Sequence, residues 1–234
     1  MIDLRPFSAL GRFDNDWLSA HYHFSFADYH DSARMGLGPL RVWNDDRIAS
    51  GGGFPMHPHR DMEIITYIRR GAISHEDHLG NRGRIEAGNV QVMSAGTGIL
   101  HSEFNRETDP TELFQIWIEP DTRRLSPSWG TRAFPRGARA DALVPLASGR
   151  ACDRDGEALA IHQDAAILCA TIGAGGRIAH ELAPGRRAYL VALGGPITLN
   201  GVALDDRDGA AITNETTIEI AADAEAEIVL ADLP

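Results

Sequence analysis

The stretch Gly51–Glu63, GGGFPMHPHRDME, contains the pattern that decides the fold of this chain. In an extended strand, side chains two positions apart point to the same side, so His57 and His59 share one face. Pro58 lies between them, fixes φ and removes an amide donor, which is typical of an edge strand or of a bent strand at a barrel mouth. The first stretch therefore predicts a strand that presents two imidazoles to one metal ion.

A second stretch, Gly96–Asn105, has the sequence GTGILHSEFN and repeats this spacing with His101 and Glu103. If the two strands face each other across a small barrel, three neutral imidazoles and one carboxylate converge on one point. This donor set suits a divalent transition metal. Four ligands leave one or two positions of an octahedral ion open, which favours chemistry over a purely structural ion.

Three other titratable side chains lie close to these stretches in the sequence. Glu63 has the same strand phase as His57 and His59, so it could be a fifth ligand or a group that orients an imidazole. His75 and His78 are three positions apart and should face opposite sides of a strand. We expect supporting or surface roles for these two histidines.

Short β-branched runs alternate with Gly and Asn turns over the first half of the chain, for example LRVW, EIITYIRRG, VQVMSAG and LFQIWIEP. No helical periodicity of useful length interrupts them. This pattern predicts an all-β antiparallel sandwich or barrel.

The strand signals divide the chain into three parts. We expect a metal-binding domain over residues 1–130, a connecting arm over residues 131–150 and a second domain over residues 151–234. In the last part, GGRIAHELAPGRRAYLVALGGPITLNG repeats the turn placement of the first half. Only His180 remains of the potential ligands, so the second domain is expected to be degenerate and to lack a metal site.

Composition excludes several classes of function. The formal net charge of −11 and the absence of a Lys/Arg-rich run argue against direct binding of nucleic acid. No apolar run approaches the ~20 residues of a membrane span, and the first residues lack a signal-peptide pattern. A cytoplasmic location is expected. Cys152 and Cys169 are too few for a disulfide framework and are expected to be free thiols.

Several separated motifs resemble a known family. The spacing of Gly51, His57, His59 and Glu63 is similar to the first cupin motif, although Gly71 lies one residue late. The end of the second motif matches Gly98, His101 and Asn105, with Gly96 in place of the usual proline. More specifically, HFSFADYHD, LRVWNDD, HPHRDMEIITYIRRG, HEDHLGNRG and SAGTGILHSE together resemble the pirin family, bicupins of bacteria and eukaryotes. The similarity is densest over residues 21–120.

The resemblance implies a fold of two cupin barrels, each a jelly roll or double-stranded β-helix, packed face to face. It implies the metal ligands His57, His59, His101 and Glu103, with Glu63 outside the ligand set. The implied ion is Fe(II), with Mn, Co, Ni, Cu or Zn as alternatives.

Bacterial pirins resemble quercetin 2,3-dioxygenases, which implies O2-dependent cleavage of a flavonol with release of CO. Glu103 would then be catalytic as a ligand and proton acceptor. The alternatives are a redox-sensing interaction protein or transcriptional co-regulator, which would take a protein partner, and a cupin acting on another phenolic metabolite. A monomer is expected. A planar substrate needs an apolar pocket, and the candidate side chains are Phe24, Phe26, Met35, Phe54, Met56 and Phe104.

Overall fold

The computed structural model describes all 234 residues and confirms the all-β prediction. The helical segments are three short 3₁₀ turns: η1 (Phe7–Ala9), η2 (Arg136–Arg139) and η3 (Ala151–Asp153). No helix is long and apolar enough to cross a membrane.

The chain divides into two compact units. The N-terminal unit contains Gly11–Ala133 and Leu159–Gln163. The C-terminal unit contains Met1–Leu10, Phe134–Ala158 and Asp164–Pro234.

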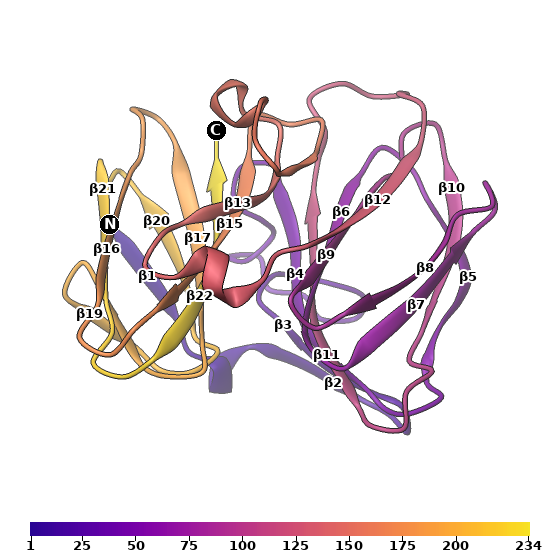
Figure 1. The fold of residues 1–234 in the computed structure, drawn as a ribbon, viewed down its shortest axis with the longest axis horizontal. Helices are drawn as coiled ribbons and strands as arrows, with labels where there is room; N and C mark the ends of the chain where they lie inside the picture. The colour runs from indigo at the N-terminus through magenta and orange to yellow at the C-terminus, as the bar shows by residue number, and fades with distance from the viewer. The chain divides into compact units, whose positions relative to one another are not determined.

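The N-terminal unit is built from two antiparallel sheets (Figure 1). The strands of these sheets are β2 (Gly11–Asp14), β3 (Leu18–Tyr22), β4 (Leu40–Ile48), β5 (Gly53–His59), β6 (Glu63–Arg70), β7 (Ala72–Asp77), β8 (Arg82–Glu86), β9 (Asn89–Ser94), β10 (Ile99–Phe104), β11 (Thr111–Ile118) and β12 (Ser128–Ala133). The short strand β14 (Leu159–Ala160) belongs to neither of them. The larger sheet has the order β12-β9-β6-β11-β4-β3-β2, and the smaller has the order β5-β10-β7-β8.

Apolar side chains from both sheets meet between them. Ile68 and Leu113 of the larger sheet share one buried cluster with Ile73 and Ile85 of the smaller sheet. The β6–β7 hairpin that joins the two sheets passes through Gly71, which has φ +77°. A Cβ there would lie 2.8 Å from the Thr111 hydroxyl, so this turn requires glycine. The two sheets thus form the walls of one barrel.

The C-terminal unit repeats the two-sheet arrangement. Its strands are β1 (Ile2–Arg5), β13 (Val144–Ser148), β15 (Ala166–Ile172), β16 (Arg177–Glu181), β17 (Arg187–Leu193), β18 (Ile197–Leu199), β19 (Val202–Leu204), β20 (Gly209–Thr213), β21 (Thr217–Ala221) and β22 (Ala226–Leu233). The unit's strands in the larger sheet follow the order β1-β20-β17-β22-β15-β13, and β16-β21-β18-β19 form the smaller sheet. Alternate side chains of β15, β17 and β22 fill an aliphatic core.

The observed units differ from the expected contiguous division into residues 1–130, 131–150 and 151–234. Strand β1 pairs with β20, so the first ten residues belong to the C-terminal unit. The expected connecting arm contains the end of β12 and also β13, which pairs with β15. The sequence of a short strand such as β1 indicates an extended conformation but does not reveal which strand it pairs with. Contacts with distant segments decide that pairing.

Candidate metal centre

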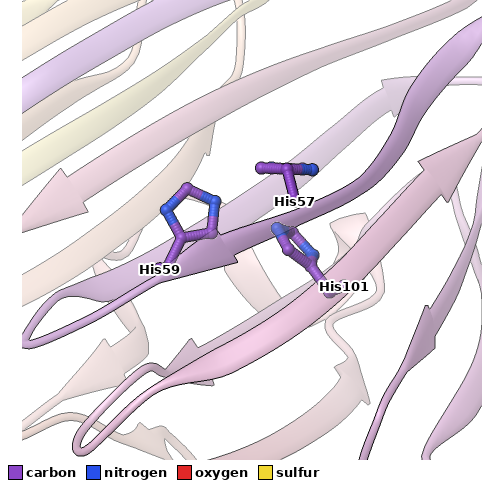
Figure 2. Close-up of side chains that lie close together, drawn as sticks. All are labelled: His57, His59 and His101. Atoms are coloured by element: carbon purple, nitrogen blue, oxygen red, sulfur yellow. The ribbon is translucent and has the colours of Figure 1, made fainter.

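Strands β5 and β10 position the predicted histidines. Along β5, the side chains of His57 and His59 are half-buried while those of Met56 and Pro58 are exposed, as expected for alternate faces. His101 of β10 lies opposite His57 in the antiparallel pairing of the two strands. Figure 2 shows the three imidazoles gathered in one space between neighbouring strands.

The distances allow the three imidazoles to share one ion. One nitrogen from each of His57, His59 and His101 lies within 4.8 Å of the others. Ring centroids are 4.8 Å apart for His57 and His59, and 4.4 Å apart for His57 and His101. Two ligands about 2.1 Å from a common ion lie at most about 4.2 Å apart, so a small inward movement of the rings would bring all three nitrogens onto one ion.

Two of the three imidazoles are held neutral by their surroundings. Burial, and then the neighbouring histidines, lower the pKa of His59 to about 4 and that of His101 to about 3. The ring Nδ1 of His57 lies 2.8 Å from the Pro55 carbonyl oxygen, to which it can only donate. This bond fixes the tautomer that leaves the Nε2 lone pair free. All three rings can therefore present a lone pair.

His101 provides a test of whether a metal fits this cluster. Its side chain is 1% exposed, and both of its ring nitrogens are buried without a hydrogen-bond partner. Burying a polar group unpaired is costly. A metal ion bound to His101 would remove part of this cost, so the donor set fits a divalent transition metal.

Glu103 lies in a second group that overlaps the first. The register of β10 against β5 shifts between His101 and Glu103, and a carboxylate oxygen of Glu103 groups with His101 and His75. Gln91 donates to one oxygen of Glu103 at 2.7 Å, and Gln115 donates to the other at 2.6 Å. The carboxylate is thus held at both oxygens beside His101.

Two tryptophan indoles contact the side-chain carbonyl groups of these glutamines. The indole of Trp129 donates to the Gln91 carbonyl at 2.8 Å, and that of Trp117 lies 3.5 Å from the Gln115 carbonyl. The sequence reasoning missed both glutamines. The available signal was an amide side chain inside a β-branched run, in VQV and in FQIW.

His75 and His78 have different environments. His75 is buried, stacks on Trp129 with centroids 5.1 Å apart, and pairs with Asp77 at 3.3 Å. His78 is exposed, and its Nδ1 accepts the amide hydrogen of Leu100 at 3.0 Å. Only His75 comes close to the proposed ligands.

Glu63 belongs to neither group of metal-type side chains. Asp61 has φ +47° between the two strands, and this turn breaks the phase that Glu63 would share with His57 and His59. Glu63 instead lies on β6 and accepts a hydrogen bond from the Ser94 hydroxyl at 2.6 Å. Burial raises its pKa, against the lowering effect of this bond and of the His162 backbone.

A cavity of about 600 Å³ opens beside the histidines. Its apolar wall includes the rings of Trp17, Tyr22, Phe26, Phe54 and Trp117. Of the expected pocket residues, Phe26 and Phe54 line the cavity, whereas Phe24, Met35, Met56 and Phe104 do not. Met35 and Met56 are exposed instead.

Comparisons with known proteins agree with this architecture. The family model described as Pirin matches residues 4–118, and the model described as Quercetinase C-terminal cupin domain matches residues 147–233. A pirin-like protein of Caulobacter vibrioides is 54% identical over 232 residues, which cover 99% of each chain. The quercetin 2,3-dioxygenase of Escherichia coli K12 is 40% identical over 235 residues, which cover 100% of this chain and 99% of the relative.

A solved structure extends the match to three dimensions. The crystal structure of the bacterial pirin YhhW from Escherichia coli in complex with nickel(II) superimposes with a TM-score of 0.93 at 40% identity. The match covers 100% of this chain and 99% of YhhW, so the expected cupin fold is confirmed. With both halves matched, this chain belongs to the pirin family.

Proposed function

We propose that this protein is a metal-dependent dioxygenase that cleaves the heterocyclic ring of a flavonol such as quercetin and releases CO. The observation that carries the proposal is a cluster of neutral imidazoles at the wall of an aromatic cavity of about 600 Å³. Pockets for small molecules have roughly this volume and this mostly apolar lining. The name of the Escherichia coli relative supports an oxygenase-type enzyme.

Four side chains would hold the metal: His57, His59, His101 and Glu103. Three nitrogen donors and one oxygen donor suit Fe(II), with Mn, Co, Ni, Cu and Zn as alternatives. The nickel complex of YhhW supports a divalent first-row ion. When bound, the ion would lower the pKa of a coordinated hydroxyl and supply the redox chemistry for reaction with O2.

Glu103 is the proposed acceptor of the proton from the flavonol 3-hydroxyl. An ionised carboxylate offers about four lone-pair sites, and the bonds from Gln91 and Gln115 use one on each oxygen. Capacity for a proton therefore remains while both glutamines hold the group in place. A general base must lie within hydrogen-bond reach of its proton, and this rigid support serves that requirement.

The aromatic wall would orient the planar substrate. Phe26 meets Trp117 edge to face with centroids 5.4 Å apart, and Phe54 meets Trp17 in the same way at 5.1 Å. Such packed rings present rigid apolar surfaces at low entropic cost. A flat ring system bound between them would keep its 3-hydroxyl toward the histidines.

The test is an anaerobic mixture of Fe(II)-loaded protein and quercetin, to which O2 is then admitted. The flavonol absorption band should bleach, and CO should appear in the headspace in proportion. Absence of turnover with Fe(II), Mn(II), Co(II), Ni(II) and Cu(II) alike would contradict the proposal.

Two variants make this test specific to the cluster. His57→Ala should lose metal, measured by elemental analysis, and should lose turnover with it. His30→Ala removes an exposed histidine that lies outside the cavity lining, and it should behave like the wild type. Unchanged metal content in His57→Ala would contradict the ligand assignment.

A further inference from the structure

We propose that Asn44 and Asp46 form a polar subsite of the cavity that binds a phenolic hydroxyl group of the substrate other than the 3-hydroxyl. The inference rests on the proposed function and narrows its substrate class to polyhydroxylated flavonols. It concerns two residues that neither hold the metal nor touch the histidine cluster in any bond described above.

Strand β4 places both side chains inside the barrel. Asn44 and Asp46 are two positions apart, so they share one face. Asn44 lies opposite Gln115 of β11, and Gln115 reaches across to Glu103 of the smaller sheet. The face of β4 that carries the pair therefore points across the barrel toward β5 and β10. A substrate that spans the cavity from the histidines would meet Asn44 and Asp46 at its other side.

The pair has polar atoms that the protein leaves unpaired. Asn44 is 4% exposed and Asp46 is 2% exposed, and both line the cavity. The Oδ1 atom of each is buried without a hydrogen-bond partner. Buried polar groups are nearly always paired in folded proteins, and each exception requires a reason. A bound polar group that draws the two side chains into hydrogen bonds supplies such a reason.

The surroundings select the kind of polar group. Tyr22, Phe26 and Trp117 line the same cavity, so a ligand that fills it is largely aromatic. A hydroxyl on an aromatic ring donates to an oxygen acceptor, and the unpaired Oδ1 atoms of Asn44 and Asp46 are such acceptors.

The charge state of Asp46 is compatible with this partner. Burial, followed by the charges of Asp45 and Glu103, raises the pKa of Asp46 well above its usual value. A phenolic hydroxyl can pair with a carboxyl group in either protonation state. The subsite can therefore bind a phenolic hydroxyl whether Asp46 is ionised or protonated.

Two flavonols separate the subsite from the metal site. Quercetin and 3-hydroxyflavone share the 3-hydroxyl and the neighbouring carbonyl, but 3-hydroxyflavone has no other hydroxyl. Their dissociation constants are measured without O2 on the metal-loaded wild type and on Asp46→Leu, Asp46→Asn and Asn44→Leu. Asp16→Leu is the matched control, because Asp16 is exposed and lies outside the cavity lining. Metal content and thermal midpoint are recorded for each variant.

Asp46→Leu should weaken quercetin binding by about 10-fold or more, since one buried hydrogen bond is lost. Its affinity for 3-hydroxyflavone should stay within about twofold of the wild type, because that ligand makes no such bond. Asn44→Leu should also reduce the preference for quercetin over 3-hydroxyflavone. Asp46→Asn should keep most of this preference. If Asp46→Leu does not fold, Asn44→Leu still tests the subsite. Asp16→Leu should change neither dissociation constant.

Equal losses for the two ligands, or no loss for either, would overturn the subsite, as would a wild type that does not prefer quercetin. The dioxygenase proposal has its own readout, the consumption of O2. A wild type with hydroxyl-dependent binding but no turnover would remove the proposed reaction and keep the subsite. Turnover of quercetin together with binding that does not depend on the other hydroxyls would support the proposed reaction and remove the subsite.

Discussion

His101 shows at the scale of one residue why the site can hold an ion. Its imidazole is buried beside those of His57 and His59, and neither of its nitrogens is paired. Protonation is opposed by burial and by the adjacent rings, as its depressed pKa of about 3 indicates. The neutral rings keep their lone pairs, which a divalent cation can use.

The substitution of glutamate by glutamine should affect metal binding at Glu103 but not at Glu63. Glu103→Gln removes a proposed anionic ligand and should weaken metal binding by about 10-fold or more. Glu63→Gln keeps an oxygen for the Ser94 hydroxyl and should leave metal binding unchanged. Isothermal titration of each variant with Ni(II) measures both. A larger loss in Glu63→Gln than in Glu103→Gln would reverse the assignment.

At the scale of the elements, a row of polar side chains crosses the larger sheet of the N-terminal unit. Gln115 of β11 lies opposite Thr66 of β6, and Thr66 lies opposite Gln91 of β9. Facing pairs in antiparallel strands point to the same side, so both glutamines reach into the barrel and bind Glu103. A one-residue slip of either strand would turn its glutamine outward.

Removal of either glutamine should loosen the metal site without unfolding the barrel. Gln91→Leu and Gln115→Leu each leave one oxygen of Glu103 without its donor, and each should lower metal affinity by about 10-fold. Equilibrium dialysis against Ni(II) followed by elemental analysis measures the change. Gln163→Leu is a control for the loss of an amide, because Gln163 donates to the Glu119 carbonyl and not to Glu103. Wild-type affinity in both test variants would contradict a supporting role.

A buried ion pair joins β4 and β6 in the same sheet. The guanidinium of Arg69 bonds to Asp45, whose side chain is fully buried, and stacks over Phe114 at 4.8 Å. Arg69→Met should lower the free energy of unfolding by about 3–5 kcal/mol, because the buried Asp45 carboxylate then loses its bond to the guanidinium.

Urea denaturation measures this loss, and a surface pair supplies the comparison. Arg47 lies 3.9 Å from Glu112 with more than half of its side chain exposed, so Arg47→Met should cost no more than about 1 kcal/mol. Similar losses in the two variants would show that burial does not set the strength of the Arg69 pair.

At the scale of the whole molecule, the two units share an architecture but differ in chemistry. Both groups of metal-type side chains belong to the N-terminal unit. In the C-terminal unit, His180 lies 3.1 Å from Asp232, which also binds Arg150 and Arg186. The surviving histidine thus belongs to an ion-pair network.

This network makes the stability of the C-terminal unit depend on pH. Burial acts to raise the pKa of Asp232, but hydrogen bonds from His180 and Arg186 and the two arginine charges outweigh it and lower the pKa. A carboxyl with a lowered folded pKa contributes stability above its unfolded pKa of about 3.9, and this contribution is lost as pH falls through the folded value.

Asp232→Asn should therefore destabilise the protein at neutral pH, and its difference from the wild type should shrink as pH falls below about 4. Thermal midpoints from pH 7 to pH 2 measure this difference. Asp223→Asn is the control, because Asp223 is exposed. A constant difference between Asp232→Asn and wild type at every pH would contradict the linkage.

Many strands of the barrel could be predicted from local patterns, but the side chains that hold Glu103 in place could not. The β-branched runs of β6, β9 and β11 lie where the sequence indicates strands. The pocket was harder to predict, because Phe26 and Phe54 line it while Met56, on the same strand as Phe54, points to solvent. Residue type reports what could line a pocket, whereas strand register and turns decide what does.

The pairing of His57 with His59 and of His101 with Glu103 could be predicted from the sequence, because the alternation of side chains is a property of a single strand. Tertiary structure alone decided that two glutamines grip Glu103, that Glu63 turns away and that β1 joins the C-terminal unit. These outcomes depend on which strands pair and in which register. Pairing is set by contacts between distant segments, and no local pattern encodes those contacts.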